Sequence, residues 1–159
     1  TALQAAALFE QMSVVKDCRI AAAIGVRNRG VTSMHDATEC GVFGGLVEIA
    51  EASGVGLRIE KESILVPEPI ARVCGHFGMN PYHAISEGSL LITCKPYRAQ
   101  ALLAALGGVS IPAAIIGEVT EKDLGLVLVE HGVEQELRHP RVDPFWRVFG
   151  ELSARHRDA

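Results

Sequence analysis

Apolar residues recur along the chain with two different periods, and the pattern predicts helices alternating with strands. Apolar residues three and four positions apart mark helical faces, whereas alternation or short apolar runs mark strands. The segments expected to be helical are 2–24 with a break at Ser13, 46–52, 67–77, 96–106 and a short stretch within 140–149. The segments expected to be strands are 31–34, 57–60, 89–94, 113–119, 124–130 and 133–137.

The order of these elements predicts the class of fold. A strand–helix–strand unit followed by a hairpin favours an α+β sandwich, with a mostly antiparallel sheet packed with helices. The strand at 124–130 is apolar on both sides, so we expect it to be covered on both faces. Ser13 is expected to cap the second helix and Gly25 to end it in a left-handed conformation. We expect one domain over residues 1–150 and a polar, disordered tail at 151–159.

Composition narrows the classes of protein that fit. The chain has 159 residues, 48% of them hydrophobic, which is enough for one compact core. Its net charge is −4 and its basic residues are scattered, which argues against nucleic-acid binding. No apolar run approaches the roughly 18 residues that span a bilayer, so we expect no membrane association. The four cysteines lack metal-type spacing and are expected to be buried, reduced thiols of a cytoplasmic protein.

The stretch at 34–46 places a polar turn and three glycines between an expected strand and an expected helix. Asp36 or Thr38 is expected to cap the helix, with Glu39 completing a capping box. Glycines at 41, 44 and 45 are unfavourable in a helix, so something must require bare backbone there. One interpretation is a phosphate or substrate facing a helix N-terminus. The other is close packing of the helix against a sheet.

The residues around this stretch resemble a known family. Two blocks carry the resemblance, HDATECGVFGGL at 35–46 and EIAEASGVG at 48–56. They resemble the aminoimidazole ribonucleotide (AIR) synthase-related superfamily, and more narrowly the C-terminal domain of its hydrogenase expression/formation branch, the carbamoyl dehydratases. Cys40 stands where that branch typically has the first glycine of a pair. The resemblance implies a PurM-like C-terminal-domain fold, and the chain then lacks the N-terminal ATP-binding domain.

The resemblance also implies a set of site residues. Those implied to bind substrate or nucleotide phosphate are His35, Asp36, Thr38, Gly41, Gly44, Gly45, Gly88 and Ser89. Glu87, in a turn before an apolar strand, is the carboxylate implied to act in chemistry or to orient substrate. The alternative for Glu87 is a turn residue in water. No metal site is expected, because the neighbours His35 and Asp36 point to opposite faces of a strand.

Members of the family are two-domain, usually dimeric enzymes that use ATP and Mg²⁺ to activate or phosphorylate a small molecule. The resemblance therefore implies ATP and Mg²⁺, held mainly by the missing domain, a small-molecule substrate and a homodimer. Because the chain starts at Thr1 within an expected helix, we interpret it as a fragment that is inactive alone. The dehydratase branch carries its carbamoyl group on a C-terminal cysteine, whereas the last cysteine here is Cys94. If this end is natural, a related but differently employed enzyme is expected.

Three hypotheses follow, in order of preference. The first is the cleft domain of an ATP-dependent synthetase or kinase, with a carbamoyl dehydratase domain as its nearest alternative. The second is a non-catalytic module that binds a small molecule. The third is a scaffold that dimerises through the apolar first helix.

Overall fold

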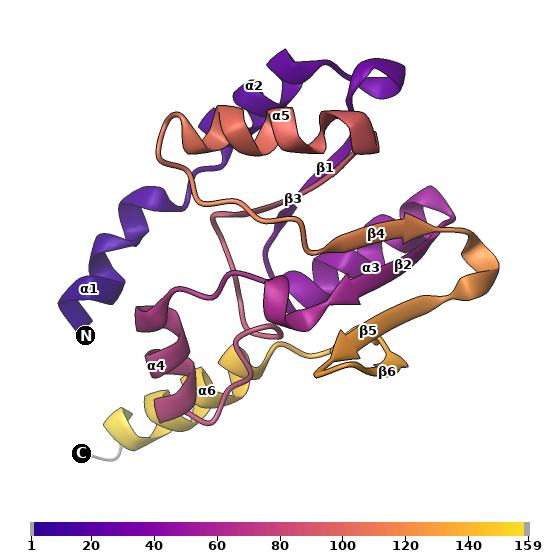
Figure 1. Cartoon of the computed structure of the whole chain (residues 1–159). Coiled ribbons are helices and arrows are strands. Elements are labelled where there is room, and N and C mark those ends of the chain that lie inside the picture. The colour runs from indigo at the N-terminus through magenta and orange to yellow at the C-terminus, as the bar shows by residue number, and fades with distance from the viewer. Residues whose placement is uncertain (1, 158–159) are drawn as a thin grey trace.

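The computed structural model describes residues 2–157 as alternating helices and strands (Figure 1). The helices are α1 (Ala2–Ala7), α2 (Val15–Ile24), α3 (Gly41–Ser53), α4 (Glu68–His76), α5 (Pro96–Gly107) and α6 (Pro144–Arg157). The strands are β1 (Val31–Ala37), β2 (Gly56–Glu60), β3 (Ser89–Cys94), β4 (Gly117–Thr120), β5 (Leu126–Glu130) and β6 (Val133–Glu136). Short 3-10 helices occupy Phe9–Gln11, Arg27–Arg29, Lys61–Ser63 and Lys122–Leu124.

The strands form two sheets. β1 pairs with β3 in an antiparallel ribbon, and the four-stranded sheet has the order β4-β2-β5-β6. Within that sheet only the β2–β5 pairing is parallel; β2–β4 and β5–β6 are antiparallel. The expected α+β fold with mostly antiparallel strands is therefore confirmed.

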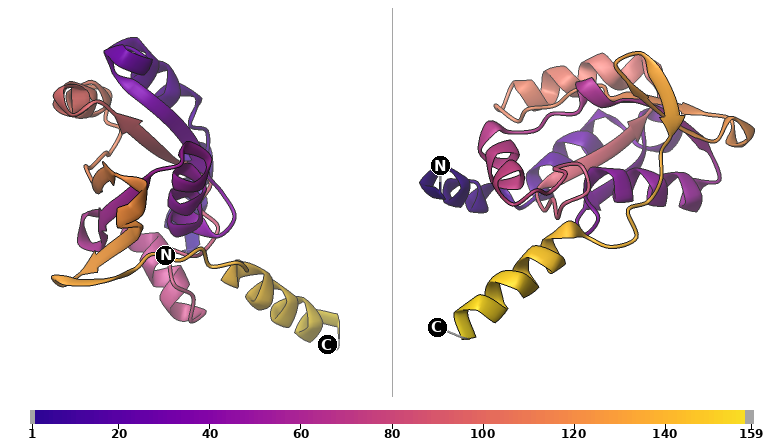
Figure 2. Two further views of the ribbon diagram at one scale, coloured as in Figure 1. Left: turned by 90° about the vertical axis from the view of Figure 1, so that its right-hand side faces the viewer. Right: turned by 90° about the horizontal axis from the view of Figure 1, so that it is seen from below.

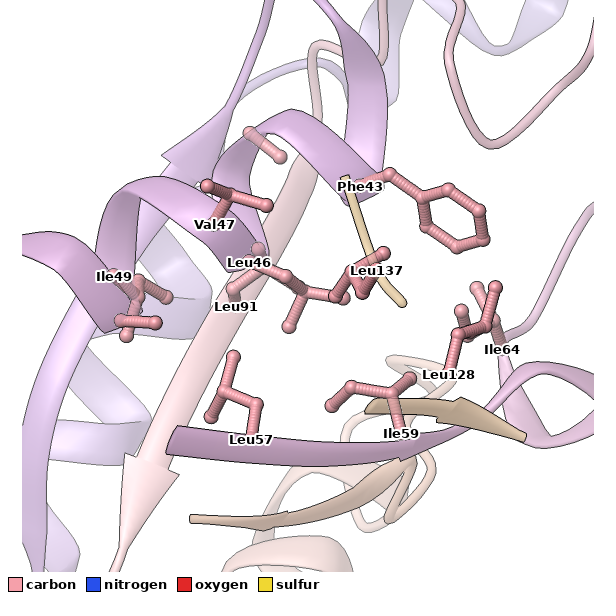
Figure 3. Packing of buried hydrophobic residues seen from close by; sticks show 12 residues of the cluster. Phe43, Leu46, Val47, Ile49, Leu57, Ile59, Ile64, Leu91, Leu128 and Leu137 are labelled. Atoms are coloured by element: carbon pink, nitrogen blue, oxygen red, sulfur yellow. The ribbon is translucent and has the colours of Figure 1, made fainter. Parts of the chain in front are cut away.

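Helix α3 supplies the centre of the main core. Its apolar side chains meet β1 and β3 on one side and β2 and β5 on the other (Figure 3). The buried members of this core are Ala37, Phe43, Leu46, Val47, Ile49, Ala50, Leu57, Ile59, Ile64, Leu91, Leu128 and Leu137. A second cluster packs α2 and α5 on the β1–β3 ribbon through Ala21, Val31, Leu102 and Leu106. The two clusters fix the β1–β3 ribbon between two layers of helices.

Three strand and helix boundaries differ from the sequence expectation near the central stretch. β1 continues to Ala37, so His35 and Asp36 lie in the strand and not in a turn. Helix α3 already begins at Gly41, which places all three glycines in its first two turns. The expected strand at 113–119 is formed only from Gly117 onward, because its partner β2 ends at Glu60. Strand pairing stops where no partner backbone remains.

The expected helix ends also needed correction. The N-cap position of α2 is Val14, and no side chain caps the helix, so the Ser13 cap was wrong. Gly25 does follow the helix, but its φ of 117° and ψ of 148° lie outside the left-handed helical region. Here the chain leaves the helix in an extended, glycine-specific conformation and reaches β1 through the 3-10 helix Arg27–Arg29.

The C-terminal segment is more ordered than its composition suggested. Helix α6 runs from Pro144 to Arg157, so residues 151–157 are helical and not disordered. Residues 158 and 159 lie outside the described part of the chain. Figure 2 shows α6, in yellow, projecting away from the body of the domain. Within residues 2–157, the structure contains no helix of the length and apolarity that a bilayer crossing demands.

Candidate functional site

The end of β1 and the turn before β3 lie together, although about fifty residues separate them in the sequence. The backbone N–H of Ser86 donates to the carbonyl of Thr38 at 3.1 Å. The Ser86 hydroxyl donates to the carbonyl of Ala37 at 3.2 Å, and Ala37 lies opposite Ser89 in the ribbon. The structure therefore brings the two sequence motifs, around residues 35–38 and 86–89, into one surface region.

Within this region the side chains of β1 divide between two faces. His35 faces α3, where its Nε2 lies 2.7 Å from Oε2 of Glu48. Asp36 is exposed, and strand geometry directs it to the opposite face of the ribbon. Thr38 is also exposed, just beyond the strand. His35 and Asp36 therefore serve different surfaces, as the sequence predicted.

The start of α3 has an unusual backbone. Cys40 at the N-cap position has φ 62° and ψ 9°, and Gly41 has φ 66°. Two successive left-handed residues are easiest for glycine, because a Cβ costs about 1–2 kcal/mol in this conformation. This accounts for the glycine pair typical of the resembled family. Cys40 adopts the same conformation with its side chain buried.

The cap of α3 comes from the other end of the chain. No side chain of the preceding loop caps the helix, so the Asp36 or Thr38 cap was wrong. Instead Oδ2 of Asp143 accepts the Cys40 backbone N–H at 2.8 Å, while its Oδ1 accepts the N–H of Phe145. Asp143 is only 2% exposed. Sequence reasoning missed this residue, although an Asp directly before a proline is a signal for the cap of a following helix.

The three glycines of α3 are packed against the chain itself. A Cβ on Gly41 would lie 2.5 Å from the carbonyl oxygen of Tyr82, and one on Gly45 would lie 2.9 Å from Cδ1 of Leu91. A Cβ on Gly44 would lie 2.7 Å from that of Cys40. Close packing, the second of the two interpretations, therefore accounts for these residues.

Four of the backbone donors at the start of α3, those of Cys40, Gly41, Phe43 and Gly44, have acceptors within the chain. Gly41 donates to Thr38, Phe43 to Tyr82 and Gly44 to Cys40. With the Cys40 N–H held by a carboxylate, these amides are not open to an anion. The engaged amides of Gly41, Phe43 and Gly44 favour the packing interpretation, and a phosphate-binding role of the backbone at 41–45 stays a prediction. The binding roles of the other motif residues stay predictions.

Two further residues near the C-terminus contact the same region. Nε2 of His139 lies 3.7 Å from Oε1 of Glu48, so this carboxylate is shared between two imidazoles. The indole N–H of Trp146 donates to Oε1 of Glu39 at 3.2 Å. No sequence motif linked His139 or Trp146 to this region, because the contacts span about a hundred residues of chain.

Glu87 occupies an exposed turn. The following Gly88 has φ 92°, and a Cβ there would lie 2.9 Å from the carbonyl oxygen of Gln11. The turn is thus shaped by contact with the segment that precedes α2. Its exposed carboxylate is available to a ligand, and its role in chemistry stays a prediction.

An aromatic and ionic cluster flanks the first turn of α3. The rings of Phe43 and Tyr82 stack with centroids 5.3 Å apart, and Nζ of Lys61 lies 5.2 Å from the Tyr82 ring centre. Lys61 also forms an ion pair with Glu130. Burial, reinforced by the charge of Lys61, lowers the pKa of His83, which keeps this imidazole neutral. The cluster borders a hollow of about 160 Å³, which none of the predicted site residues lines.

The cysteines show no features of nucleophiles. All four thiols are free, as expected, but only Cys40 and Cys74 are buried, whereas Cys18 and Cys94 are half-buried. Burial, with the nearby charge of Asp143, raises the pKa of the Cys40 and Cys74 thiols. Raised values disfavour the reactive thiolate. Within residues 2–157, no three His, Cys, Asp or Glu side chains converge as a metal centre requires.

Comparison with known proteins agrees with this geometry. Residues 2–129 match the sequence model of the family "AIR synthase related protein, C-terminal domain". The carbamoyl dehydratase HypE of Escherichia coli K12 is 31% identical over 121 residues, covering 75% of this chain and 36% of that protein. The crystal structure of E. coli HypE, a hydrogenase maturation protein, superposes with a TM-score of 0.73 at 30% identity, covering 85% of this chain and 41% of that one.

A structure of the hydrogenase maturation protein HypE in complex with ATP is also similar, with a TM-score of 0.60 and 28% identity. It covers 70% of this chain and 37% of that one. The chain thus spans well under half the length of the relatives it matches. Because the family match extends over most of its residues, the chain belongs to the family of AIR synthase related proteins, C-terminal domain.

Proposed function

We propose that this chain serves as the substrate- and nucleotide-facing half of an ATP-dependent enzyme of the hydrogenase-maturation branch. One observation carries the proposal. The two motifs at 35–38 and 86–89 lie together and expose Asp36, Thr38 and Glu87, on a fold shared with a HypE protein that binds ATP. The reaction would activate an oxygen of a small molecule by phosphorylation, as in a synthetase, a kinase or a carbamoyl dehydratase.

The exposed and half-buried polar residues of this region have distinct chemical capacities. Asp36 and Glu87 offer carboxylates, and Thr38 and Ser89 offer hydroxyls that both donate and accept. His35 donates one ring N–H to Glu48, which leaves Nδ1 as an acceptor toward a ligand. The carboxylates and the Thr38 hydroxyl suit a substrate with N–H donors, such as an amide, whereas His35 faces α3 on the other side of the ribbon. The glycines at 41, 44 and 45 contribute by letting the first two turns of α3 pack closely against the chain.

The negative charge of this region indicates that the chain does not bind nucleotide phosphates without a second domain. Exposed carboxylates at Asp36, Glu39 and Glu87 repel a polyphosphate directly. Mg²⁺ is usually bound through one or two carboxylates together with substrate phosphates, so Asp36 and Glu87 fit a supporting role. When bound, the ion would supply charge neutralisation. We therefore assign most phosphate and Mg²⁺ contacts to a second, ATP-binding domain.

Reconstitution tests this proposal. ATP turnover is measured for the 159-residue chain alone and with the ATP-binding half of the E. coli relative. We expect no turnover alone and turnover in the mixture. Asp36→Asn and Glu87→Gln should each lower the restored rate by tenfold or more, which is the scale of lost polar contacts at a reacting centre. Glu118→Gln, an exposed carboxylate on β4, is the matched control and should have no effect.

Two outcomes would contradict the proposal. One is steady ATP hydrolysis by the chain alone that Asp36→Asn abolishes, because the second domain would then be unnecessary. The other is restored turnover that is indifferent to both Asp36→Asn and Glu87→Gln. A homodimer and a cytoplasmic location remain further proposals, which sizing of the reconstituted enzyme and cell fractionation would test.

A second candidate function has its own observation. The N-terminal segment carries exposed apolar side chains, with Leu3 87% and Phe9 71% exposed. Exposed apolar side chains in one segment favour association, so a dimerisation scaffold is the alternative. Sedimentation should then show concentration-dependent dissociation that Leu3→Glu and Phe9→Glu shift to the monomer. Leu124→Glu, at a leucine that is 66% exposed in another part of the chain, is the control.

A further inference from the structure

We propose that the corner where the chain enters β1 and leaves β3 is a docking surface for an acidic segment of a partner protein. We name this surface the basic corner; it consists of the 3-10 helix Arg27–Arg29 and of residues 95–98 at the start of α5. Its charged and aromatic side chains are Arg27, Arg29, Lys95, Tyr97 and Arg98. The proposed function uses none of these residues, so the docking surface goes beyond it.

Charge is distributed unevenly between two parts of the chain. Residues 18–35 and 88–117 contain five basic side chains and no acidic one. The whole chain has a net charge of −4, so the remaining residues carry −9. The two stretches supply most of α2 and β1 and all of β3 and α5, which pack together (Figure 1). Basic residues that are scattered along the sequence are thus gathered in one layer of an otherwise acidic molecule.

Hydrogen bonds between its two segments build the basic corner. The Tyr97 hydroxyl donates to the carbonyl of Asn28 at 2.8 Å. Nε of Arg98 donates to the carbonyl of Arg29 at 3.1 Å, and its guanidinium carbon lies 5.7 Å from the centre of the Tyr97 ring. These contacts fix the aromatic and guanidinium groups before any partner arrives, which lowers the entropy lost on binding.

The charges of the basic corner are not neutralised by the chain itself. Arg27 and Arg29 are exposed, and Tyr97 is 66% exposed, whereas Lys95 and Arg98 are half-buried. Among residues 2–157, no acidic side chain forms an ion pair with any of these four basic residues. By contrast, the basic residues of β2 and of the turn after it are paired with glutamates. The corner therefore presents positive charge that a partner can use.

The composition of the basic corner favours a protein as the partner. Arginine and tyrosine are enriched among the residues that dominate protein–protein binding energy. A guanidinium also binds a carboxylate through two parallel N–H donors. A long polyanion such as a nucleic acid, or an anionic bilayer, would extend beyond the corner and meet the acidic remainder of the chain. A short acidic segment fits the corner without this repulsion.

The basic corner and the candidate site lie at opposite ends of the β1–β3 ribbon. Val31 pairs with Cys94 at the end near the corner, and Ala37 pairs with Ser89 at the end near the site. A strand rises about 3.3 Å per residue, so the two ends are roughly 20 Å apart. A partner bound at the corner therefore leaves the candidate site accessible to a substrate and to an ATP-binding domain.

Titration of the isotope-labelled 159-residue chain with a synthetic peptide tests the docking. The probe is a short peptide in which Glu and Asp alternate with Leu and Tyr. The reference peptide has Gln and Asn in place of the acids. We expect the acidic peptide, and not the reference, to shift the amide resonances of residues 27–30 and 95–98. The affinity should fall as salt is added, because salt screens exposed charges.

Charge-reversal variants identify the residues that bind the peptide. In Arg29→Glu and Lys95→Glu the described hydrogen bonds of the altered residues are kept, because they use backbone atoms. Each variant should weaken binding at least about threefold, and the double variant at least about tenfold. Arg155→Glu, at an exposed arginine of α6, makes the same change in net charge and is the matched control. Unshifted amides of the core cluster around Leu102 verify that each variant is folded.

Four outcomes would overturn the proposal. The first is an acidic peptide that shifts no resonance of the basic corner. The second is an equal loss of affinity in Arg155→Glu, because net charge alone would then explain binding. The third is tighter binding of an oligothymidylate or of phosphatidylserine vesicles than of the peptide at physiological salt, because the partner would then belong to another class. The fourth is a shift of the corner resonances by the ATP-binding half of the E. coli relative, because the corner would then be an interface within the enzyme.

These measurements are independent of the proposed function. The peptide titration uses neither ATP nor a substrate, so its failure leaves the reconstitution experiment unaffected. A reconstituted mixture that does not turn over ATP would refute only the proposed function. Binding of the acidic peptide that Arg29→Glu and Lys95→Glu weaken would still support the docking surface.

Discussion

The two ends of α3 use glycine for different reasons. Gly41 at the first turn and Gly54 after the last have nearly the same backbone conformation, with φ of 66° and 65°. Around Gly54 there is open space, whereas a Cβ on Gly41 would meet backbone atoms of residues 82–84. Gly54 is therefore required only for its left-handed conformation. Gly41 is required for that conformation and also because a Cβ would clash with neighbouring backbone.

The largest expected effect comes from Gly41→Ala. The added Cβ would lie 2.5 Å from the Tyr82 carbonyl oxygen and 2.8 Å from that of Ala84, and backbone atoms cannot turn aside as a flexible side chain does. Overpacking and left-handed strain together should cost about 3–5 kcal/mol of unfolding free energy. Urea unfolding measures it. A loss no larger than that of Gly54→Ala would end the distinction between the two ends.

Gly45→Ala should have an intermediate effect. Its Cβ would meet Cδ1 of Leu91, the far end of a side chain, at 2.9 Å and the Cβ of Ala37 at 3.2 Å. Because Leu91 can partly yield, the cost should be about 1–3 kcal/mol. A double-mutant cycle with Leu91→Ala checks the cause: the two changes should compensate, giving a coupling energy well above zero. Strict additivity would show that Leu91 does not limit the space.

Gly54→Ala should cost only the conformational penalty. With no neighbouring atom within 4 Å, the substitution adds left-handed strain alone, about 1 kcal/mol. Gly54→Asn should cost less, because Asn tolerates this conformation at helix ends. If Ala and Asn destabilise equally and by more than about 2 kcal/mol, the C-terminal end is less open than the structure indicates.

The contrast between Gly41 and Gly54 also explains which features could be predicted from the sequence. The pattern of apolar residues located every helix and strand of the core, because periodicity is a local signal. The sequence could not show why residue 41 must be glycine, because the reason is a contact with a turn about forty residues away. The same holds for the cap of α3. Local rules pointed to Asp36 or Thr38, while the carboxylate that binds Cys40 is Asp143.

For the candidate site, the sequence pointed to two motifs that the fold brings together, and their binding role stays a prediction. His35, Thr38 and Ser89 do gather at one place, since strand pairing follows from the alternating pattern. Glu48 and His139, which complete the surroundings of His35, carry no motif. Glu48 of α3 and His139 near the C-terminus come together only in the folded structure. The contact between Glu48 and His139 spans about ninety residues of chain and leaves no periodic signal in the sequence.

The smallest expected effect is the loss of one ion pair's contribution to stability at acidic pH. The hydrogen bond from Lys61 holds the pKa of Glu130 below its ordinary value, and Lys61 rests on Tyr82 beside the N-terminal end of α3. A carboxyl group whose pKa is lowered in the folded state stabilises the fold above its unfolded pKa, roughly 4.3, and this contribution is lost as pH falls through the folded pKa. Glu130→Gln should therefore destabilise the chain slightly near neutral pH, and the gap to the unmodified chain should close in acid. Thermal unfolding from roughly pH 7 down to pH 3 follows the gap, with Glu121→Gln, an exposed carboxylate beyond β4, as the control. A gap that widens in acid would mean that the Lys61 contact does not favour the ionised carboxylate, and that the N-terminal end of α3 is held without it.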